Sequence, residues 1–214
     1  PVTLIRATSE LALRRNRDAE EYRAALQKIH AHSEHMTRLT DSLLTIAQAE
    51  SGAVSMPLAP LDLSSLVREV VEEAAAVAQE RSVDLGTDVP EEPRIAIVNP
   101  EGIERLLLIL IDNALKYTPA GGRVTVGVTE TNEGLNLSVS DTGPGISREA
   151  LPHIFERFYR ADPEHGSSNG AGLGLSIAQM IAHAHRSVIE VESVPGTGSK
   201  FWMRVMTESV TAED

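Results

Sequence analysis

The chain has 214 residues, of which 42% are apolar, and it carries a formal net charge of −12 at pH 7. This length suits one sizeable domain or two smaller ones. The acidic balance argues against a nucleic-acid-binding face, because such a face needs concentrated Lys and Arg. The chain has no cysteine, which excludes disulfides and thiolate metal sites.

No apolar run approaches the ~18 residues of a membrane span, so the sequence predicts a soluble chain. The first residue is Pro1, without a Met or a signal-peptide pattern before it. We therefore expect a fragment or a processed product.

Residues 1–50 are rich in helix formers and predict two helices, joined by a polar turn at 14–18. The second, from about 19 to 50, has a heptad seam in which residues recur at alternating spacings of three and four. A hairpin cannot bury such a seam alone, so we predict a homodimer through 1–50, as a four-helix bundle. The alternative is that the hairpin packs on its own globular domain. The seam consists of Leu26, Ile29, Ser33, Met36, Thr40, Leu43 and Ala47.

Ser51-Gly52 ends the second helix, and the following segment contains two prolines, which is typical of a linker. Further helices are expected at about 62–80 and 101–117, the latter capped by Asn99. The predicted units are a hairpin over 1–52, a linker over 53–60, a globular domain over 61–207 and a frayed acidic tail over 208–214.

The run Asp141-Thr142-Gly143-Pro144-Gly145 follows a predicted strand in which Leu135, Leu137 and Val139 alternate with polar residues. This alternation places Asp141 on the apolar face, where a carboxylate needs a donor. One interpretation is the floor of a pocket in which Asp141 accepts from an amino group of a flat ligand. The other is an Asp that caps a turn into a helix starting at 146–149.

Asn113, Lys116 and Tyr117 share one face at the end of the 101–117 helix. An amide, an ammonium group and an aromatic ring suit a nucleotide, through metal ligation, phosphate charge and base stacking. The alternative is a plain helix end, in which Lys116 interacts with the helix dipole and Tyr117 packs.

Residues 154–160 hold three of the seven aromatic residues and precede a Ser/Gly-rich loop. This composition suggests a lid, with Arg157 and Arg160 available for phosphate. Residues 170–176 lead into a predicted helix at 177–185, and their glycines favour an anion site. The run is not a dinucleotide fingerprint, because Leu175 stands where a glycine is needed, nor is it a P-loop. None of the seven histidines has the spacing or acidic neighbours of a metal site.

Four stretches therefore occur in order: 113–119, 141–145, 155–160 and 170–175. Together they resemble the N, G1, F and G2 boxes of sensor histidine kinases, bacterial two-component proteins of the GHKL ATPase superfamily, and 196–198 resembles a further glycine box. The resemblance implies an α+β chain: a helical hairpin that forms a dimeric four-helix bundle, then an α/β sandwich. Its mixed, mostly antiparallel sheet would lie under three helices, with ATP and Mg²⁺ between the sheet edge and the lid.

The resemblance also implies residue roles. Asn113 would ligate Mg²⁺, Lys116 would face phosphate and Tyr117 adenine, and Asp141 would accept from the adenine amino group. Arg160, with Arg157 as a second candidate, resembles the lid arginine at the γ-phosphate, so Arg160 and Lys116 are the implied catalytic residues. The full set implied for ATP binding is Asn113, Lys116, Tyr117, Asp141, Gly143, Gly145, Ile146, Arg157, Arg160, Gly170, Gly172, Leu173, Gly174, Leu175 and Thr197.

The beginning of the chain resembles the family's phosphoacceptor hairpin, with 1–5 similar to the segment that starts at the proline of its His-Glu-x-x-Thr-Pro box. The acceptor histidine would lie five residues before Pro1, outside this chain. ATP-hydrolysing relatives carry a glutamate four residues before the Mg²⁺ asparagine, where this chain has Ile109, so hydrolysis is disfavoured as the main activity. Residues 184–187 replace a common glycine pair of the family, a change expected to affect only a turn.

The implied function is the cytoplasmic catalytic core of a sensor histidine kinase, whose parent protein is attached to the inner membrane. In the parent, the γ-phosphoryl group of ATP passes to a histidine and then to an aspartate of a response regulator. Two alternatives are a non-catalytic nucleotide-binding dimerisation module and another GHKL-type kinase or ATPase.

Overall fold

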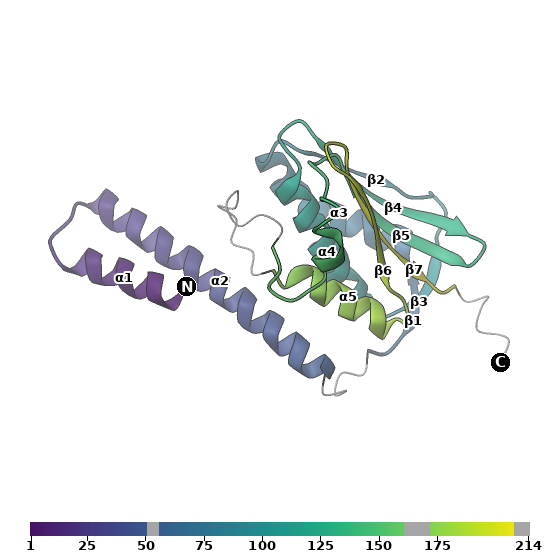
Figure 1. Ribbon diagram of the computed structural model, residues 1–214, viewed down its shortest axis with the longest axis horizontal. Coiled ribbons are helices and arrows are strands. Elements are labelled where there is room, and N and C mark those ends of the chain that lie inside the picture. Colours follow the sequence, from purple (N-terminus) through teal and green to yellow (C-terminus); the bar gives the residue numbers. More distant parts are fainter. Residues whose placement is uncertain (51–55, 161–171, 208–214) are drawn as a thin grey trace. The chain divides into compact units, whose positions relative to one another are not determined.

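The computed structural model describes residues 1–50, 56–160 and 172–207, with only the backbone defined at 35, 38, 39, 41–43 and 45–50. The chain divides into two compact units, Pro1–Ala53 and Val54–Asp214 (Figure 1). Within the described ranges, no helix combines the length and apolar character needed to cross a membrane.

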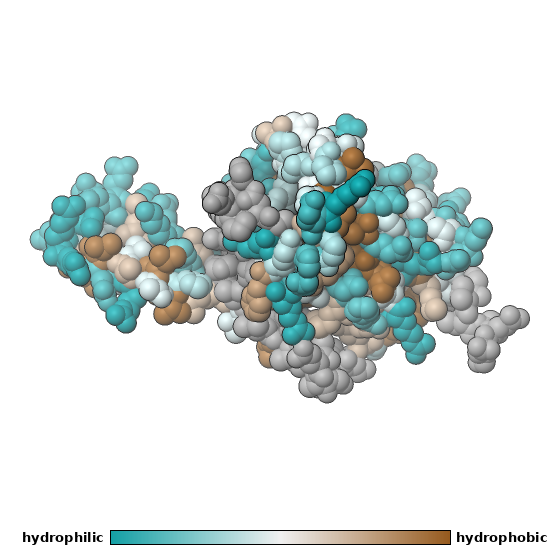
Figure 2. Space-filling view, in the orientation of Figure 1, coloured by the Kyte–Doolittle hydropathy of each residue, from teal (hydrophilic) through white to brown (hydrophobic). Residues whose placement is uncertain are grey.

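The first unit is a hairpin of two helices, α1 (Val2–Leu13) and α2 (Ala19–Glu50). Asp18 begins α2 by accepting the backbone N–H of Glu21 at 2.7 Å. Arg17 in the turn donates to the carbonyl oxygen of Leu11 in α1 and to the carboxylate of Glu21 in α2, at 3.0 Å each, which links the two helices. Apolar side chains nevertheless remain on the surface (Figure 2), among them Leu13, 80% exposed, and Leu26 of the heptad seam, 64% exposed.

The second unit contains a five-stranded sheet in the order β2-β4-β5-β7-β6, in which β2 and β4 are parallel and the other neighbours antiparallel. A separate antiparallel pair is formed by β1 and β3. The strands are β1 (Ala59–Asp62), β2 (Asp84–Asp88), β3 (Ile95–Val98), β4 (Arg123–Thr131), β5 (Gly134–Asp141), β6 (Ile189–Val194) and β7 (Gly198–Val205).

Three helices cover one face of this sheet: α3 (Leu63–Glu80), α4 (Pro100–Tyr117) and α5 (Gly174–Ala184) (Figure 1). Strand β5 follows the expected alternation in its apolar residues, since Leu135, Leu137 and Val139 are buried, and Val124, Val126 and Val128 of β4 are buried in the same way. Asn99 caps α4 by accepting the N–H of Gly102 at 2.8 Å. The predicted helical hairpin followed by an α/β sandwich with a mixed sheet is therefore confirmed.

Two local expectations differ from the structure. The last two residues of the predicted linker, 53–60, belong to strand β1. This strand has β3 as its single neighbour, and Pro60 lies opposite Ile97. A proline is tolerated there, since an edge strand does not need all its N–H groups. The helix expected at 146–149 is instead a turn that leads into the short 3₁₀ helix η1 (Leu151–His153).

Asp62 joins β1 to α3 and receives three hydrogen bonds. Its Oδ1 accepts the N–H groups of Ser64 at 3.0 Å and Arg94 at 2.8 Å, and its Oδ2 accepts the Ser65 hydroxyl at 2.6 Å. Burial by itself raises the pKa of this carboxyl, but the donors, led by the Ser65 hydroxyl, outweigh burial and lower the pKa. The ionised side chain therefore stabilises the fold.

We predict that Asp62→Ala lowers the free energy of unfolding by about 1–2 kcal/mol at neutral pH, as loss of a helix N-cap does. The stabilisation is present above the pKa of the unfolded carboxyl and is lost as the pH falls through the lowered folded value. Urea unfolding at neutral and acidic pH measures both effects, with Glu73→Ala on the exposed face of α3 as control. A difference from wild type that does not shrink in acid would contradict this assignment.

Candidate nucleotide site

The end of β5 and the end of α4 lie side by side. A methyl group placed on Gly143 would be 3.2 Å from the carbonyl oxygen of Tyr117. The start of α5 is also next to α4, since a methyl group on Gly174 would be 3.7 Å from Nδ2 of Asn113 and 3.3 Å from Cγ2 of Ile109. Three of the stretches singled out in the sequence thus meet at one place.

The fourth stretch joins them through the backbone of Gly172. The N–H of Phe158 donates to the Gly172 carbonyl oxygen at 2.8 Å. The backbone of Phe158 is left-handed, with φ of 65°, and its side chain is 62% exposed. Arg157 is exposed and Arg160 half-buried in the same segment, whereas Gly170 lies outside the described residues.

Asp141 is the last residue of β5 and continues the inward-facing row of Leu135, Leu137 and Val139. It accepts the N–H of Gly143 at 2.8 Å, as a turn-capping Asp does. Burial raises the pKa of its carboxyl, although the backbone N–H groups of Gly143 and Ser199 act in the opposite direction. A carboxylate has about four lone-pair sites, so capping the turn leaves capacity for a further donor.

The loop after Asp141 is held against the turn between β6 and β7 by Ser193. The Ser193 hydroxyl accepts the N–H of Ile146 at 2.7 Å and lies 3.1 Å from the Gly198 carbonyl oxygen and 3.0 Å from the Ser199 hydroxyl. The predicted site residue Thr197 is exposed in this turn. Sequence reasoning missed Ser193, because a serine in a strand has no distinctive spacing.

Two positions in this loop and turn accept only glycine. Gly145 and Gly198 have φ of 70° and 136°. A Cβ at Gly145 would overlap the carbonyl oxygen of Val194, and a Cβ at Gly198 would overlap that of Asp141. The backbones are therefore in direct contact, which fixes the position of Asp141.

Asn113, Lys116 and Tyr117 occur together at the end of α4, as the helical spacing predicts. Nζ of Lys116 lies 4.7 Å from the centroid of the Tyr117 ring. Tyr117 is 53% exposed. Asn113 is half-buried, and its carboxamide forms no hydrogen bond with another described residue. The aromatic ring, the ammonium group and the amide oxygen are thus all available to a ligand.

The N-terminus of α5 presents backbone N–H groups to the same region. Leu173 precedes the helix, is 2% exposed and provides no side-chain cap. Uncapped N–H groups and the helix dipole together attract anions such as phosphate. Gly174 and Leu175 are half-buried in the first turn.

The donor set also fits a magnesium ion that is completed by a ligand. An amide oxygen is a ligand that Mg²⁺ accepts, and protein Mg²⁺ sites often use one or two side chains together with substrate phosphates and water. The described residues hold no group of three or more His, Asp or Glu that could bind a metal without such help.

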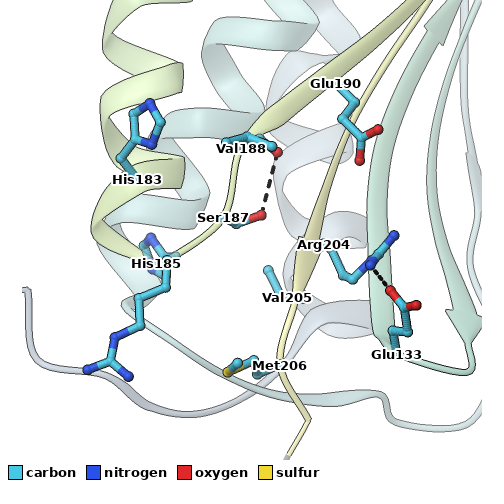
Figure 3. Close-up of a pocket in the computed structure, with 10 residues that line it drawn as sticks. Glu133, His183, His185, Ser187, Val188, Glu190, Arg204, Val205 and Met206 are labelled. Carbon is cyan, nitrogen blue, oxygen red and sulfur yellow. Dashed lines mark hydrogen bonds and ion pairs between the residues drawn. The ribbon is translucent and has the colours of Figure 1, made fainter.

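An open pocket of about 500 Å³ lies next to the start of β5 and the end of β7 (Figure 3). It is distant from Asp141 along the strands, because Val205 in its lining pairs with Leu135, whereas Asp141 pairs with Ser199. An ion pair between Arg204 and Glu133 borders it. No predicted site residue lines this pocket.

The chain matches two families of known domains. Residues 98–209 match the family described as histidine kinase-, DNA gyrase B- and HSP90-like ATPase, and residues 1–52 match the His Kinase A (phospho-acceptor) domain. Sensor histidine kinase YkoH of Bacillus subtilis (strain 168) is 37% identical over 206 residues, which is 95% of this chain and 44% of YkoH. This chain thus spans less than half the length of that relative.

Two solved structures show the same arrangement of elements. The full-length ShkA complex with AMPPNP gives a TM-score of 0.77 at 26% identity, over 97% of this chain and 46% of that chain. Histidine kinase ThkA in complex with the response regulator protein TrrA gives 0.77 at 21% identity, over 98% and 59%. On both domain matches and the similarity to YkoH, the chain belongs to the sensor histidine kinases of two-component signal transduction.

Proposed function

We propose that this chain binds ATP with Mg²⁺ at the site between β5, α4 and α5, as the catalytic core of a protein-histidine kinase. The observation that supports it most directly is the convergence of Asp141, Asn113 and the N-terminus of α5, the first on the sheet and the others on two helices. The ShkA structure, which contains AMPPNP, agrees with nucleotide binding by this fold.

In this proposal the adenine and phosphate halves of the ligand have separate supports. Asp141 accepts from the adenine amino group, in the space that Gly143, Gly145 and Ile146 leave, and Tyr117 packs against the ring. Lys116, Arg160 and the N–H groups that begin α5 neutralise the phosphates, and Asn113 holds Mg²⁺. The metal supplies charge neutralisation at the phosphate oxygens. Catalysis is thus mostly positioning and electrostatic stabilisation.

The residue at position 109 favours transfer to a protein over hydrolysis. Ile109 lies beside Gly174, 3.3 Å from a methyl group placed there, so an apolar side chain stands where a water-activating base would be needed. The exposed apolar residues of the hairpin support a homodimer through 1–50. We also propose a response-regulator aspartate as the final acceptor, as the ThkA–TrrA complex suggests. We further propose that the chain is the cytoplasmic part of a membrane-attached sensor.

We predict that Asp141→Asn weakens ATP binding about tenfold or more, because an amide NH₂ then faces the adenine amino group. Burial raises the pKa of Asp141, so the fold favours the neutral acid. Stability therefore falls as the pH rises from the ordinary value of 3.8 through the raised value. The neutral Asn removes this cost, and the variant is expected to be at least as stable as wild type.

Calorimetric titration with ATP and urea unfolding at neutral pH test both statements, with Asp112→Asn on the exposed face of α4 as control. An unchanged ATP affinity in Asp141→Asn would remove Asp141 from the adenine site.

We predict that Ser193→Ala weakens binding of ATP and of adenosine by the same factor, about three- to tenfold, as loss of a neutral hydrogen bond does. The Ile146 N–H loses the Ser193 hydroxyl that accepts its hydrogen bond. The loop around Ile146 contacts the adenine part of the ligand, which ATP and adenosine share. Competition binding of the two ligands measures the factors, with Ser187→Ala as control. A loss confined to ATP would contradict this role.

We predict that the chain binds ATP with Mg²⁺ but does not phosphorylate itself, because none of its seven histidines fits the acceptor box. Incubation with γ-labelled ATP followed by acid- and base-stability tests of the labelled protein measures this. Acid-labile label on a histidine of this chain would show that the acceptor lies within it.

A further inference from the structure

The C-terminal end of α5 is joined to the start of α4 by the side chain of His185. This residue is 8% exposed. Its Nε2 lies 2.9 Å from the backbone nitrogen of Asn99, and its Nδ1 lies 2.7 Å from the carbonyl oxygen of Ile181. A backbone N–H can only donate and a carbonyl can only accept, so the ring carries its proton on Nδ1 and accepts at Nε2.

Asn99 is itself held on three sides. Its Oδ1 caps α4 at the N–H of Gly102, at 2.8 Å, and its Nδ2 donates to the carbonyl oxygen of Pro57 at 3.1 Å. Its backbone N–H is the group that His185 accepts. The imidazole therefore binds a fixed point, the junction of β3 and α4.

The His185 ring also fits tightly against the first turn of α4. A methyl group placed on Gly102 would lie 3.3 Å from Cε1 of His185 and 3.0 Å from Oδ1 of Asn99. There is thus little space for a side chain at position 102, and the ring lies close to the bare backbone of the first turn of α4.

The side chain is not needed to end α5. The N–H groups of Ser187 and Arg186 already satisfy the carbonyl oxygens of Ala182 and His183, at 2.9 Å each, with Arg186 left-handed at φ of 56°. This is the Schellman pattern, which completes a helix C-terminus through the backbone alone. Segment 184–187 thus does more than turn the chain, contrary to the expectation from its sequence.

We propose that His185 is a positioning residue for the phosphate half of the ATP site. It fixes the end of α5 against the start of α4. Asn113 and Gly174 lie at the other ends of these two helices, and the distance between them determines the shape of the phosphate site. The inference rests on the proposed function. Asp141 and Ser193 belong to the sheet, and Tyr117 lies at the other end of α4, where its carbonyl oxygen is next to Gly143. The adenine half therefore depends much less on His185 than the phosphate half does.

The test compares MgATP with adenosine, which shares the base but lacks the phosphates. His185→Leu keeps a similar bulk and removes both hydrogen bonds. We expect MgATP to bind about three- to tenfold more weakly and adenosine to change by less than about twofold. In His185→Gln the amide can both accept and donate, so the ratio of MgATP affinity to adenosine affinity returns most of the way to the wild-type value.

His183→Leu is the matched control, because His183 is exposed on the same helix (Figure 3). If His185→Leu does not fold, as judged by circular dichroism, Gly102→Ala replaces it. The added methyl crowds both Oδ1 of Asn99 and the His185 ring and so disturbs their junction, while alanine favours the helix. The same loss of the MgATP-to-adenosine ratio is expected.

Calorimetry on the full 214-residue chain gives each affinity. An unchanged ratio, or an equal loss for both ligands, overturns the positioning role, because overall destabilisation weakens both ligands alike. If wild type binds neither ligand, the proposed function itself fails, and the inference fails with it.

Discussion

Direct contact between backbones, without side chains between them, is the constraint on which the site depends. At Gly198 and Gly145 any Cβ atom would overlap a carbonyl oxygen of a neighbouring strand or turn. These contacts bring the end of β5 against the turn between β6 and β7, and they place the Asp141 carboxylate at the sheet edge. In the proposed site, the strand end at Asp141 and the end of α4 at Tyr117 hold the adenine half, whereas α4 and the start of α5 present the phosphate half. The site is therefore a junction of two separately supported parts.

The sequence was informative where one residue type has one physical meaning. Alternating apolar residues predicted β5, Asn99 predicted the start of α4, and the glycine-rich runs predicted the candidate site loops. Strand β1 was missed because the prolines at 57 and 60 are as typical of a linker as of an edge strand. Local composition cannot separate these cases, because the deciding partner, β3, lies more than thirty residues away along the chain.

The residues that support the site were not predictable for the same reason. Ser193 and His185 act through Ile146 and Asn99, which are 47 and 86 residues away in sequence. A serine in a strand and a histidine after a helix are ordinary in isolation, and only the fold shows that both are acceptors for a backbone N–H. The helix start expected at 146–149 is a turn that leads into η1, and the bond from the Ile146 N–H to Ser193 is a long-range contact that local sequence does not show.

The half-buried carboxylate of Asp141 has a consequence for which bases can enter. Burial raises its pKa, so the charged form is poorly hydrated and favours a partner that donates a hydrogen bond. A purine with an amino group opposite Asp141 relieves this deficit, whereas a purine with a carbonyl oxygen there brings a second acceptor and leaves both unpaired. Discrimination of this kind is strong, because the rejected base loses a bond and leaves a buried charge unsatisfied. In the proposed site, selectivity for adenine over guanine would thus arise from poor solvation of one side chain, without any additional contact.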